Sequence, residues 1–478
     1  MNKPGYKWIA LSCTTIGALF SVLSASTLMI ALPVIMKDLN AGMGIIMWTI
    51  MGYMFSLTIL VPSIGRIADM FGRKKLYVSG FSLFTIASLF CALSSTGTEL
   101  LIFRMVQSVG ASLMIANSTA IITDAFPKGE LGKALGVNSM VVSVAAVIGP
   151  ILGGFLINFG WRNIFYINIP IGIFGTFWAA VSLREMKDTN VDEKFDFSGT
   201  FTFTFGLLSL LLALTVGGFT KWLNKPVILL FSIAMLLIAA FIYIENHKEY
   251  PMLDMRLLKT RLLAFAYAST LLNGIARGAV TFLLIFYFEG DKGIDPITAG
   301  ILLSPFAIAM MAVSPVSGWI CDKYGARILS SAGLLVSALG LIGFMKISTT
   351  SSMGTLVLCM IITGIGSGMF FSPNTSAIMS NVPADKRGIA AGVRTMFNNA
   401  GMVLSIAISM AIISTSIPPD AMQSLFVHSH VSSASIASNQ FIRGLRTAFT
   451  ISFFFSLFAA LISYLRGPAP NWNSQSVS

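Results

Sequence analysis

Long runs of apolar residues, separated by short polar segments, recur along the whole chain. A window of about 19 residues, close to the length that a helix needs to cross a bilayer, marks fourteen such runs. They cover residues 8–36, 45–68, 76–94, 98–122, 133–158, 163–183, 198–218, 224–244, 262–288, 297–320, 328–346, 353–379, 388–414 and 447–466. The pattern predicts an all-α integral membrane protein with fourteen transmembrane helices.

Composition agrees with this prediction, since 55% of the residues are apolar, 10% are charged and the mean hydropathy is +0.82. A soluble domain does not need so apolar a chain. The first run is too long for the apolar part of a signal peptide, and further runs follow it, so we interpret it as a retained span. An even number of crossings places both termini on one side of the membrane.

The net charge of +12 is explained by topology and not by a nucleic-acid partner. Most Lys and Arg residues fall on the side of the membrane that would also hold the termini, which by the positive-inside rule is the cytoplasmic side of the cell membrane. The four cysteines have no disulfide or metal-ligand spacing. We see no phosphate-binding loop and no catalytic cluster, so we expect no cofactor, no metal and no enzymatic activity.

The chain repeats itself. Residues 65–75 (GRIADMFGRKK) return in degraded form 253 residues later as residues 318–327 (GWICDKYGAR). A second register, 256 residues apart, aligns Gly132 with Gly388 and Gly136 with Gly392. We therefore expect a six-helix bundle at 1–190, two inserted helices at 191–250, which we interpret as lipid-facing, and a second six-helix bundle at 251–478. Parallel repeats of this kind hold a substrate site near the membrane midplane.

Four stretches resemble the major facilitator superfamily, specifically its fourteen-helix branch of drug:proton antiporters. They are the hairpin at 65–75, RMVQSVG at 104–110 with Ser108 where a glycine is usual, GPILGG at 149–154, and WRNIFYINIPIG at 161–172. The resemblance implies a monomeric secondary transporter that exports small amphiphilic compounds or drugs by alternating access, in exchange for protons.

The resemblance also assigns roles to residues. The hairpins would form a cytoplasmic gate from Gly65, Asp69, Gly72, Arg73, Lys74, Asp322 and Arg327. The alternative is a basic loop that only sets topology. The glycine-rich fifth span would be a close-packed, bent helix typical of exporters that work by exchange, through Gly149, Pro150, Gly153 and Gly154.

One departure from the family concerns the coupling ion. Many members of this branch have an aspartate in the first helix where this chain has Ser24, and every acid lies at a loop or at the end of a span. A proton carrier normally needs a buried carboxylate. Proton coupling therefore rests mainly on the resemblance, and the candidates for it are Arg104, Asp124, Glu99 and Glu289.

The charges inside the spans are positive, because Arg104, Arg277 and Arg394 have no acid at similar depth. Unpaired charges inside a bilayer mark functional sites by default. Candidates for the substrate cavity are Tyr53, Asn117, Asn138, Asn273, Arg277, Asn374, Arg394 and Asn398. Ordinary hydrogen bonds between helices are an equal alternative. A cationic cavity would prefer anionic or zwitterionic amphiphiles, so a second hypothesis is a pH-independent facilitator or exporter of an anionic metabolite.

Overall fold

The structure is a computed structural model of the 478-residue chain. It describes residues 5–41, 43–185, 196–219, 222–248, 251, 259–288, 292–294, 296–383, 386–416 and 434–467. Its elements are helices throughout this described part. Helices are expected here because backbone N–H and C=O groups inside a bilayer must be paired within the segment that crosses it.

The first part of the chain forms α1 (Tyr6–Asp38), α2 (Met43–Phe71), α3 (Arg73–Leu93), α4 (Gly97–Ala125), η1 (Lys128–Glu130), α5 (Leu131–Ile157), α6 (Asn163–Tyr166) and α7 (Asn168–Ser182). Then follow α8 (Phe197–Phe219) and α9 (Lys225–His247). The last part forms α11 (Arg261–Phe286), α12 (Pro296–Tyr324), α13 (Ala326–Phe344), α14 (Met353–Ser380), α15 (Arg387–Ser416) and α17 (Ala434–Leu465).

Thirteen helices of the described part are long and apolar enough to cross a membrane, with α6 and α7 together forming one of them. The fourteenth predicted crossing is α15, a helix of 30 residues. Its polar side chains, among them Arg394 and Asn398, are buried against neighbouring helices and do not face lipid. Each of the fourteen predicted crossings therefore has a helix in the described part of the structure.

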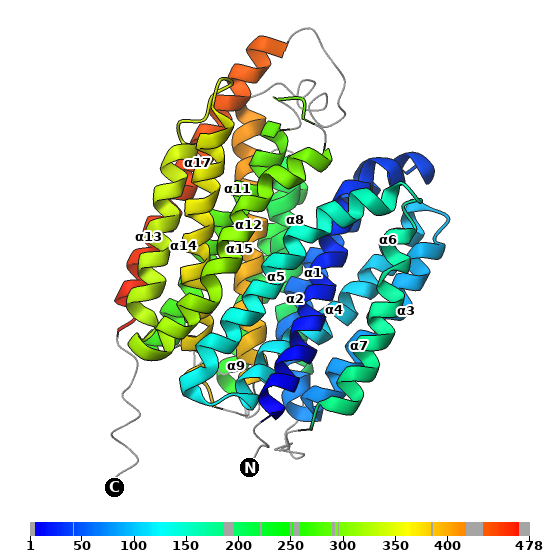
Figure 1. The fold of residues 1–478 in the computed structure, drawn as a ribbon, viewed down its shortest axis with the longest axis vertical. Helices are drawn as coiled ribbons and strands as arrows, with labels where there is room; N and C mark the ends of the chain where they lie inside the picture. Colours follow the sequence, from blue (N-terminus) through cyan, green and yellow to red (C-terminus); the bar gives the residue numbers. More distant parts are fainter. Residues whose placement is uncertain are drawn as a thin grey trace.

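The helices form two bundles that stand side by side, with α1–α7 in one and α11–α17 in the other (Figure 1). The start of α1 and the end of α17 lie at the same end, which is lowest in Figure 1 and which we call the lower end. The first bundle meets the second chiefly where α5 packs on α12 and α2 packs on α15. Every site described below is positioned by these two seams or by the interior of one bundle.

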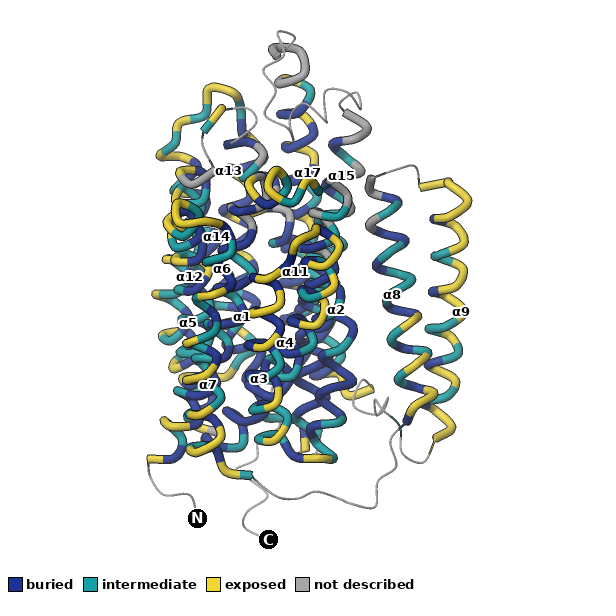
Figure 2. Tube along the Cα trace, turned by 90° about the vertical axis from the view of Figure 1, so that its right-hand side faces the viewer, coloured by how far each residue is buried: buried dark blue, intermediate teal, exposed yellow. Residues whose placement is uncertain are grey.

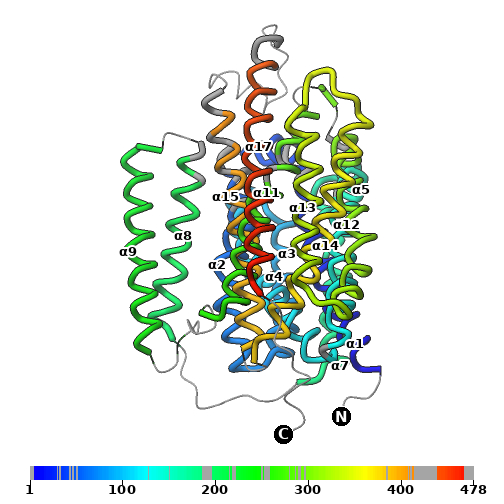
Figure 3. The backbone as a smooth tube through the Cα atoms, turned by 90° about the vertical axis from the view of Figure 1, so that its left-hand side faces the viewer, coloured from blue at the N-terminus to red at the C-terminus, as the bar shows by residue number. Residues whose placement is uncertain are grey.

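The pair α8 and α9 stands beside the bundles, as Figure 2 shows from one side and Figure 3 from the other. Helix α8 packs on α15 and α2, whereas α9 packs on α8 and leaves most of its apolar surface exposed. This arrangement fits the interpretation of the inserted pair as lipid-facing. The proposed division of the chain at residues 190 and 250 remains a prediction.

Glycines allow the two helices of each seam to approach closely at the lower end. A Cβ on Gly65 would collide with the carbonyl of Gly388, and a Cβ on Gly318 would collide with the carbonyl of Gly132. These two contacts are equivalent under the internal repeat. One helix from each bundle is thus in backbone contact with its partner, which allows side chains at the helix ends to reach across.

The glycine-rich motif of α5 packs inside the first bundle. Gly149 lies against Ser26 and Gly153 lies against Thr27, both on α1. Pro150 and Gly154 belong to the same stretch of α5. The motif therefore fixes α5 to α1, while the lower part of α5 contacts the second bundle through Gly132 and its neighbours.

Candidate functional site

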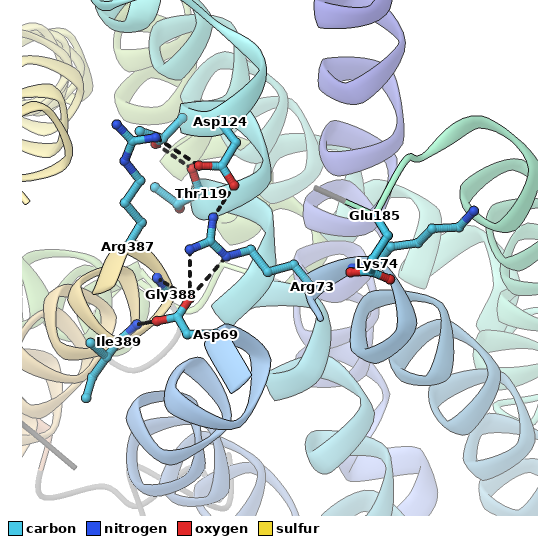
Figure 4. A network of polar contacts seen from close by, with 10 residues as sticks. Asp69, Arg73, Lys74, Thr119, Asp124, Glu185, Arg387, Gly388 and Ile389 are labelled. Carbon is cyan, nitrogen blue, oxygen red and sulfur yellow. Dashed lines mark hydrogen bonds and ion pairs between the residues drawn. The ribbon is translucent and has the colours of Figure 1, made fainter. Parts of the chain in front are cut away.

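At the lower end of α2, Asp69 caps a helix of the other bundle. Its carboxylate accepts hydrogen bonds from the backbone N–H groups of Gly388 and Ile389, each at 3.1 Å, in the first turn of α15 (Figure 4). That turn contains no acidic residue of its own. The first N–H groups of a helix lack partners within it and carry partial positive charge, so an acid from elsewhere stabilises them. The cap joins the two bundles.

Arg73, Asp124 and Arg387 extend this cap into a network. Arg73 donates to Asp69 through Nη2 at 2.7 Å and Nε at 3.1 Å, and it also forms an ion pair with Asp124. The second oxygen of Asp124 accepts from Arg387 Nη1 at 2.9 Å, across the seam (Figure 4). Two acids and two arginines make the network neutral, and the Asp69 side chain is 2% exposed. Charges that neutralise one another in this way can be buried at tolerable cost.

The second hairpin repeats the cap without the network. Asp322, at the end of α12, accepts from the N–H groups of Gly132 at 2.8 Å and Lys133 at 3.0 Å, in the first turn of α5. Arg327, a predicted gate residue, turns away and donates from Nε to the carbonyl of Tyr464 at 2.7 Å. It therefore braces α13 on α17 and takes no recorded part in the cap.

The turn between α2 and α3 depends on Gly72, whose φ of +105° favours glycine. Lys74 begins the next turn of helix, and its backbone N–H donates to the Glu185 carboxylate at 3.2 Å. The Lys74 side chain points away from Asp69 and Asp124 in Figure 4. Of the basic residues predicted in this hairpin, Arg73 is thus the one whose side chain joins the network.

Two of the coupling candidates are not brought to this network. Glu99 lies exposed at the upper end of α4, where its side chain accepts from the N–H of Ser95 at 2.8 Å and its own N–H donates to Thr96 Oγ1 at 3.2 Å. These contacts cap the first turn of α4 and stabilise the start of the helix. Glu289 lies outside the described residues. Asp124 is the acidic candidate that the structure places in a charged network.

A second polar cluster lies inside the first bundle, around Arg104. Its Nη1 donates to Gln107 Oε1 and, at 3.4 Å, to Ser24 Oγ. The guanidinium lies 4.3 Å from the centre of the Tyr53 ring, a cation–π contact. Asn168 Nδ2 donates to the same Ser24 oxygen at 3.3 Å. Ser24, which stands where many members of the family have an aspartate, is thus in direct contact with Arg104 of the fourth-helix motif. Its side chain is a hydroxyl and not a carboxylate.

A third cluster lies between α11 and α15. Arg277 Nη2 and Asn398 Nδ2 lie 3.7 and 3.9 Å from the Met402 sulfur. One turn from Asn398, the guanidinium of Arg394 lies 5.0 Å from the centre of the Phe371 ring. Among the described residues, neither arginine has an ion pair with a carboxylate. The sequence prediction that these helices carry uncompensated positive charge is consistent with this geometry.

The predicted asparagines play different parts. Asn374 is engaged in packing: it donates to the Ala266 carbonyl at 3.2 Å and to Thr270 Oγ1 at 2.9 Å, and accepts from Arg466 Nη1 at 3.0 Å. Asn117 and Asn138 each have a buried side-chain oxygen with no partner in the described part of the structure. Asn273 is buried in α11.

Sequence reasoning did not single out Arg387, Arg466, Gln107 or Asn168. Arg387 immediately precedes Gly388, a position that the internal repeat aligns with Gly132, so its place at a helix start opposite the first hairpin was a usable signal. The other three residues sit at ordinary polar positions within helices. Their contacts depend on how helices rotate about their axes, which the hydrophobic pattern does not specify.

Comparison with known proteins fits this architecture. The sequence matches the protein-family model of the Major Facilitator Superfamily over residues 14–253 and 266–477. The chain is 33% identical to the riboflavin transporter RibZ of Clostridioides difficile, over 91% of this chain and 93% of that one. It is 30% identical to the multidrug transporter MdtP of Bacillus subtilis, over 86% of this chain and 76% of that one. The solved structure of the human organic anion transporter MFSD10 has the same fold, with a TM-score of 0.67 at 14% identity, covering 95% of this chain and all of that one. The chain belongs to the major facilitator superfamily and is a multi-pass membrane transporter, not an enzyme.

Proposed function

We propose that this protein exports small amphiphilic compounds across the cell membrane by alternating access, as a monomer with both termini in the cytoplasm. The observation that carries the proposal is the pair of reciprocal caps, in which Asp69 holds α15 and Asp322 holds α5 at the lower end. Both caps must break before that end can open. They therefore act as a gate between the two bundles, and alternating access requires one bundle to move against the other in this way.

Assignment of the lower end to the cytoplasm is supported by charge. The basic loops of the hairpins, including Arg73, Lys74 and Lys75, lie there, as the positive-inside rule requires of cytoplasmic loops. Export is supported by relatives that are named multidrug transporters and a tetracenomycin C resistance and export protein. With the lower end closed, the described conformation would be the one that releases compounds to the outside.

Proton antiport is the coupling that we propose, with Asp124 as the group that carries the proton. Asp124 forms ion pairs with Arg73 in its own bundle and with Arg387 in the other. Protonation would remove its charge and weaken both links together, so the lower end would open more readily. A carboxylate placed in this way couples proton binding to the gate without lying in the substrate cavity.

A second candidate is transport of anionic compounds without proton coupling. It is favoured by Arg104, Arg277 and Arg394, which lie within spans and have no carboxylate partner among the residues that the structure describes. Such a cavity attracts negative charge and repels cations. The name of the riboflavin transporter relative adds a planar aromatic compound to the substrates worth testing.

Uptake into proteoliposomes made with the purified protein tests both candidates. The probes are ethidium, riboflavin and an anionic amphiphile such as a fluorescent sulfonate, each with and without an imposed pH gradient. Accumulation of ethidium driven by the gradient, and lost in Asp124→Asn, would support proton-coupled export. Movement of the anion alone, unaffected by pH and reduced in Arg277→Gln or Arg394→Gln, would support the second candidate. If no probe moves, the proposal of amphiphile export is wrong.

A further inference from the structure

Arg104 is the most deeply buried arginine in the described part of the structure. Its side chain lies about two turns below the upper end of α4 and is 2% exposed. An arginine remains positively charged at any physiological pH. Arg73, the comparable arginine at the lower end, contacts two carboxylates. Arg104 contacts none in the described part of the chain.

All the groups recorded around Arg104 are neutral. Its hydrogen bonds go to an amide oxygen of Gln107 and a hydroxyl of Ser24. The titratable groups that interact with Arg104 are the phenol of Tyr53 and the thiol of Cys91. Both groups are neutral at physiological pH. The cluster as a whole therefore carries a charge of +1. An uncompensated charge in a membrane interior is strongly unfavourable unless a counter-ion, water or lipid headgroup compensates it.

The cluster also has more donors than acceptors. The Ser24 oxygen accepts from both Arg104 and Asn168, so the hydroxyl hydrogen of Ser24 is left to donate elsewhere. Arg104 Nε and the Tyr53 hydroxyl are both buried, and neither has a hydrogen-bond partner among the described residues. The amide nitrogen of Gln107 is itself a donor, directed to Ser88 Oγ at 2.6 Å, so it offers Nε no acceptor. What the cluster lacks is an acceptor with negative charge.

We propose that Arg104, Ser24 and Tyr53 form a binding site for one anionic group inside the first bundle. A guanidinium binds carboxylates and other anions through several N–H groups at once, and the neighbouring hydroxyls supply further donors. The occupant is either a small inorganic anion or the carboxylate of a transported compound. The carboxylate alternative rests on the proposed transport of anions, whereas the inorganic alternative does not.

Two substitutions of Ser24 distinguish the effect of a negative charge from the effect of a larger side chain. Because Ser24 Oγ lies 3.4 Å from Arg104 Nη1, Ser24→Asp places a fixed carboxylate beside the arginine and replaces the bound anion. Ser24→Asn adds the same number of heavy atoms without charge and is the matched control. Both variants keep Arg104, so neither removes a buried charge that the fold has to accommodate.

The measurement is the thermal midpoint of the purified full-length protein in detergent, with no gradient. Salts are compared at equal ionic strength: sodium gluconate as the bulky reference, sodium chloride as the inorganic probe and sodium benzoate as the carboxylate probe. We expect chloride or benzoate to raise the midpoint of the wild type and of Ser24→Asn by about 3 °C. Ser24→Asp should be as stable in gluconate as in either probe.

The two probes distinguish the sources of the anion. A shift with chloride identifies an inorganic occupant, and a shift with benzoate that chloride reduces identifies an organic carboxylate. The proposal fails if neither probe shifts the wild type, or if Ser24→Asp responds as the wild type does, because the anion would then bind elsewhere. Since the assay involves no transport, its failure leaves the export assay unaffected, and the reverse also holds.

Discussion

The hairpins after α2 and α12 place an aspartate at equivalent positions of the repeat, yet their surroundings differ. Asp69 contacts two backbone N–H groups and also Arg73, which continues to Asp124 and Arg387. Asp322 makes the same two kinds of backbone contact, but has no ion pair within the described structure. Both aspartates cap a helix of the opposite bundle, and one of them is also part of a four-residue charged network.

The internal repeat explains where the difference arises. Under the two registers, the counterparts of Arg73, Asp124 and Arg387 are Ala326, Ser380 and Leu131, none of which is charged. The caps depend on a single aspartate and on glycines, and both copies retain them. The network needs three further side chains, and one copy has them. We infer that the seam between α2 and α15 responds to charge, whereas the seam between α5 and α12 is held by backbone contacts.

The largest effect is expected from filling the glycine contacts that both seams share. Gly65→Val and Gly318→Val each push a side chain into a backbone carbonyl of the other bundle, which cannot move without separating the helices. We expect transport into proteoliposomes to fall at least about tenfold in each variant, because overpacking of this kind costs about 1–3 kcal/mol. Gly129→Val is the control, since its new side chain meets nothing within 4 Å. Wild-type rates in both glycine variants would contradict close contact at the seams.

Removing the charge of each aspartate tests the comparison directly. Asp69→Asn leaves Arg73 with one acid fewer in a buried site, and losing one partner of a buried pair costs about 3–5 kcal/mol. Asp322→Asn weakens a cap, at a cost of about 0.5–2 kcal/mol. We therefore expect the transport rate to fall further in Asp69→Asn than in Asp322→Asn. Equal losses would mean that the caps alone close the gate.

Lys74→Ala is the control for these variants. The sequence placed Lys74 in the gate beside Arg73, but its side chain points away from the network (Figure 4). Its backbone N–H, which contacts Glu185, is unchanged by the substitution. We expect transport within about twofold of the wild type, because substitutions away from the core and from a charged network usually have small effects. A loss as large as that of Asp69→Asn would show that the network extends to Lys74.

Much of this fold was predictable because each helix that crosses a bilayer needs about 20 mainly apolar residues in a row. The predicted spans coincide with helices of the described structure to within a few residues for most crossings. The exception is the last helix, which begins at Ala434 and not near residue 447. Its first turns are polar, so a window that scores apolarity cannot detect them. Likewise, α15 was found as a span although its polar face lowers its hydropathy.

The site was less predictable than the fold. Asp69 and Arg73 were found because their motif lies close together in sequence, but their partner Arg387 is more than 300 residues away. Asp124 was selected as an acid near the membrane interior, and its position between two arginines could not be read from spacing. Asn374 looked like a cavity residue, yet it is tied to Arg466 and Thr270. Helix rotation decides such outcomes, and the hydrophobic pattern leaves rotation loosely specified.

A smaller effect is expected from breaking the ion pair between Asp124 and Arg387, whose side chains are 13% and 18% exposed. Arg387→Gln and Asp124→Asn should each lower the transport rate measured without a pH gradient, and the double variant should lose less than the sum of the two, with a coupling of about 0.5–3 kcal/mol. Leu131 and Ser380 occupy the equivalent positions of the other seam, so Ser380→Ala provides the control. Additive losses would mean that the two residues act independently and that the network does not cross the seam.

The smallest effect is expected at the opposite end of the molecule, where Asp38 forms an exposed pair that serves as a reference for the buried network. Its carboxylate accepts from Trp161 Nε1 at 2.7 Å and Arg162 Nη1 at 3.0 Å. The hydrogen bond from Trp161 and then that from Arg162 hold the pKa of Asp38 below its usual value. A carboxyl whose pKa is lower in the folded state stabilises the protein at neutral pH, and this contribution is lost as the pH falls through that lowered pKa. Asp38→Asn should therefore lower the thermal midpoint by about 1 °C at pH 7, and the difference from the wild type should shrink and then vanish as the pH falls below the usual range of an aspartate pKa. If its effect at pH 7 equalled that of Asp69→Asn in the same assay, burial would not be what distinguishes the charged gate from an ordinary surface pair.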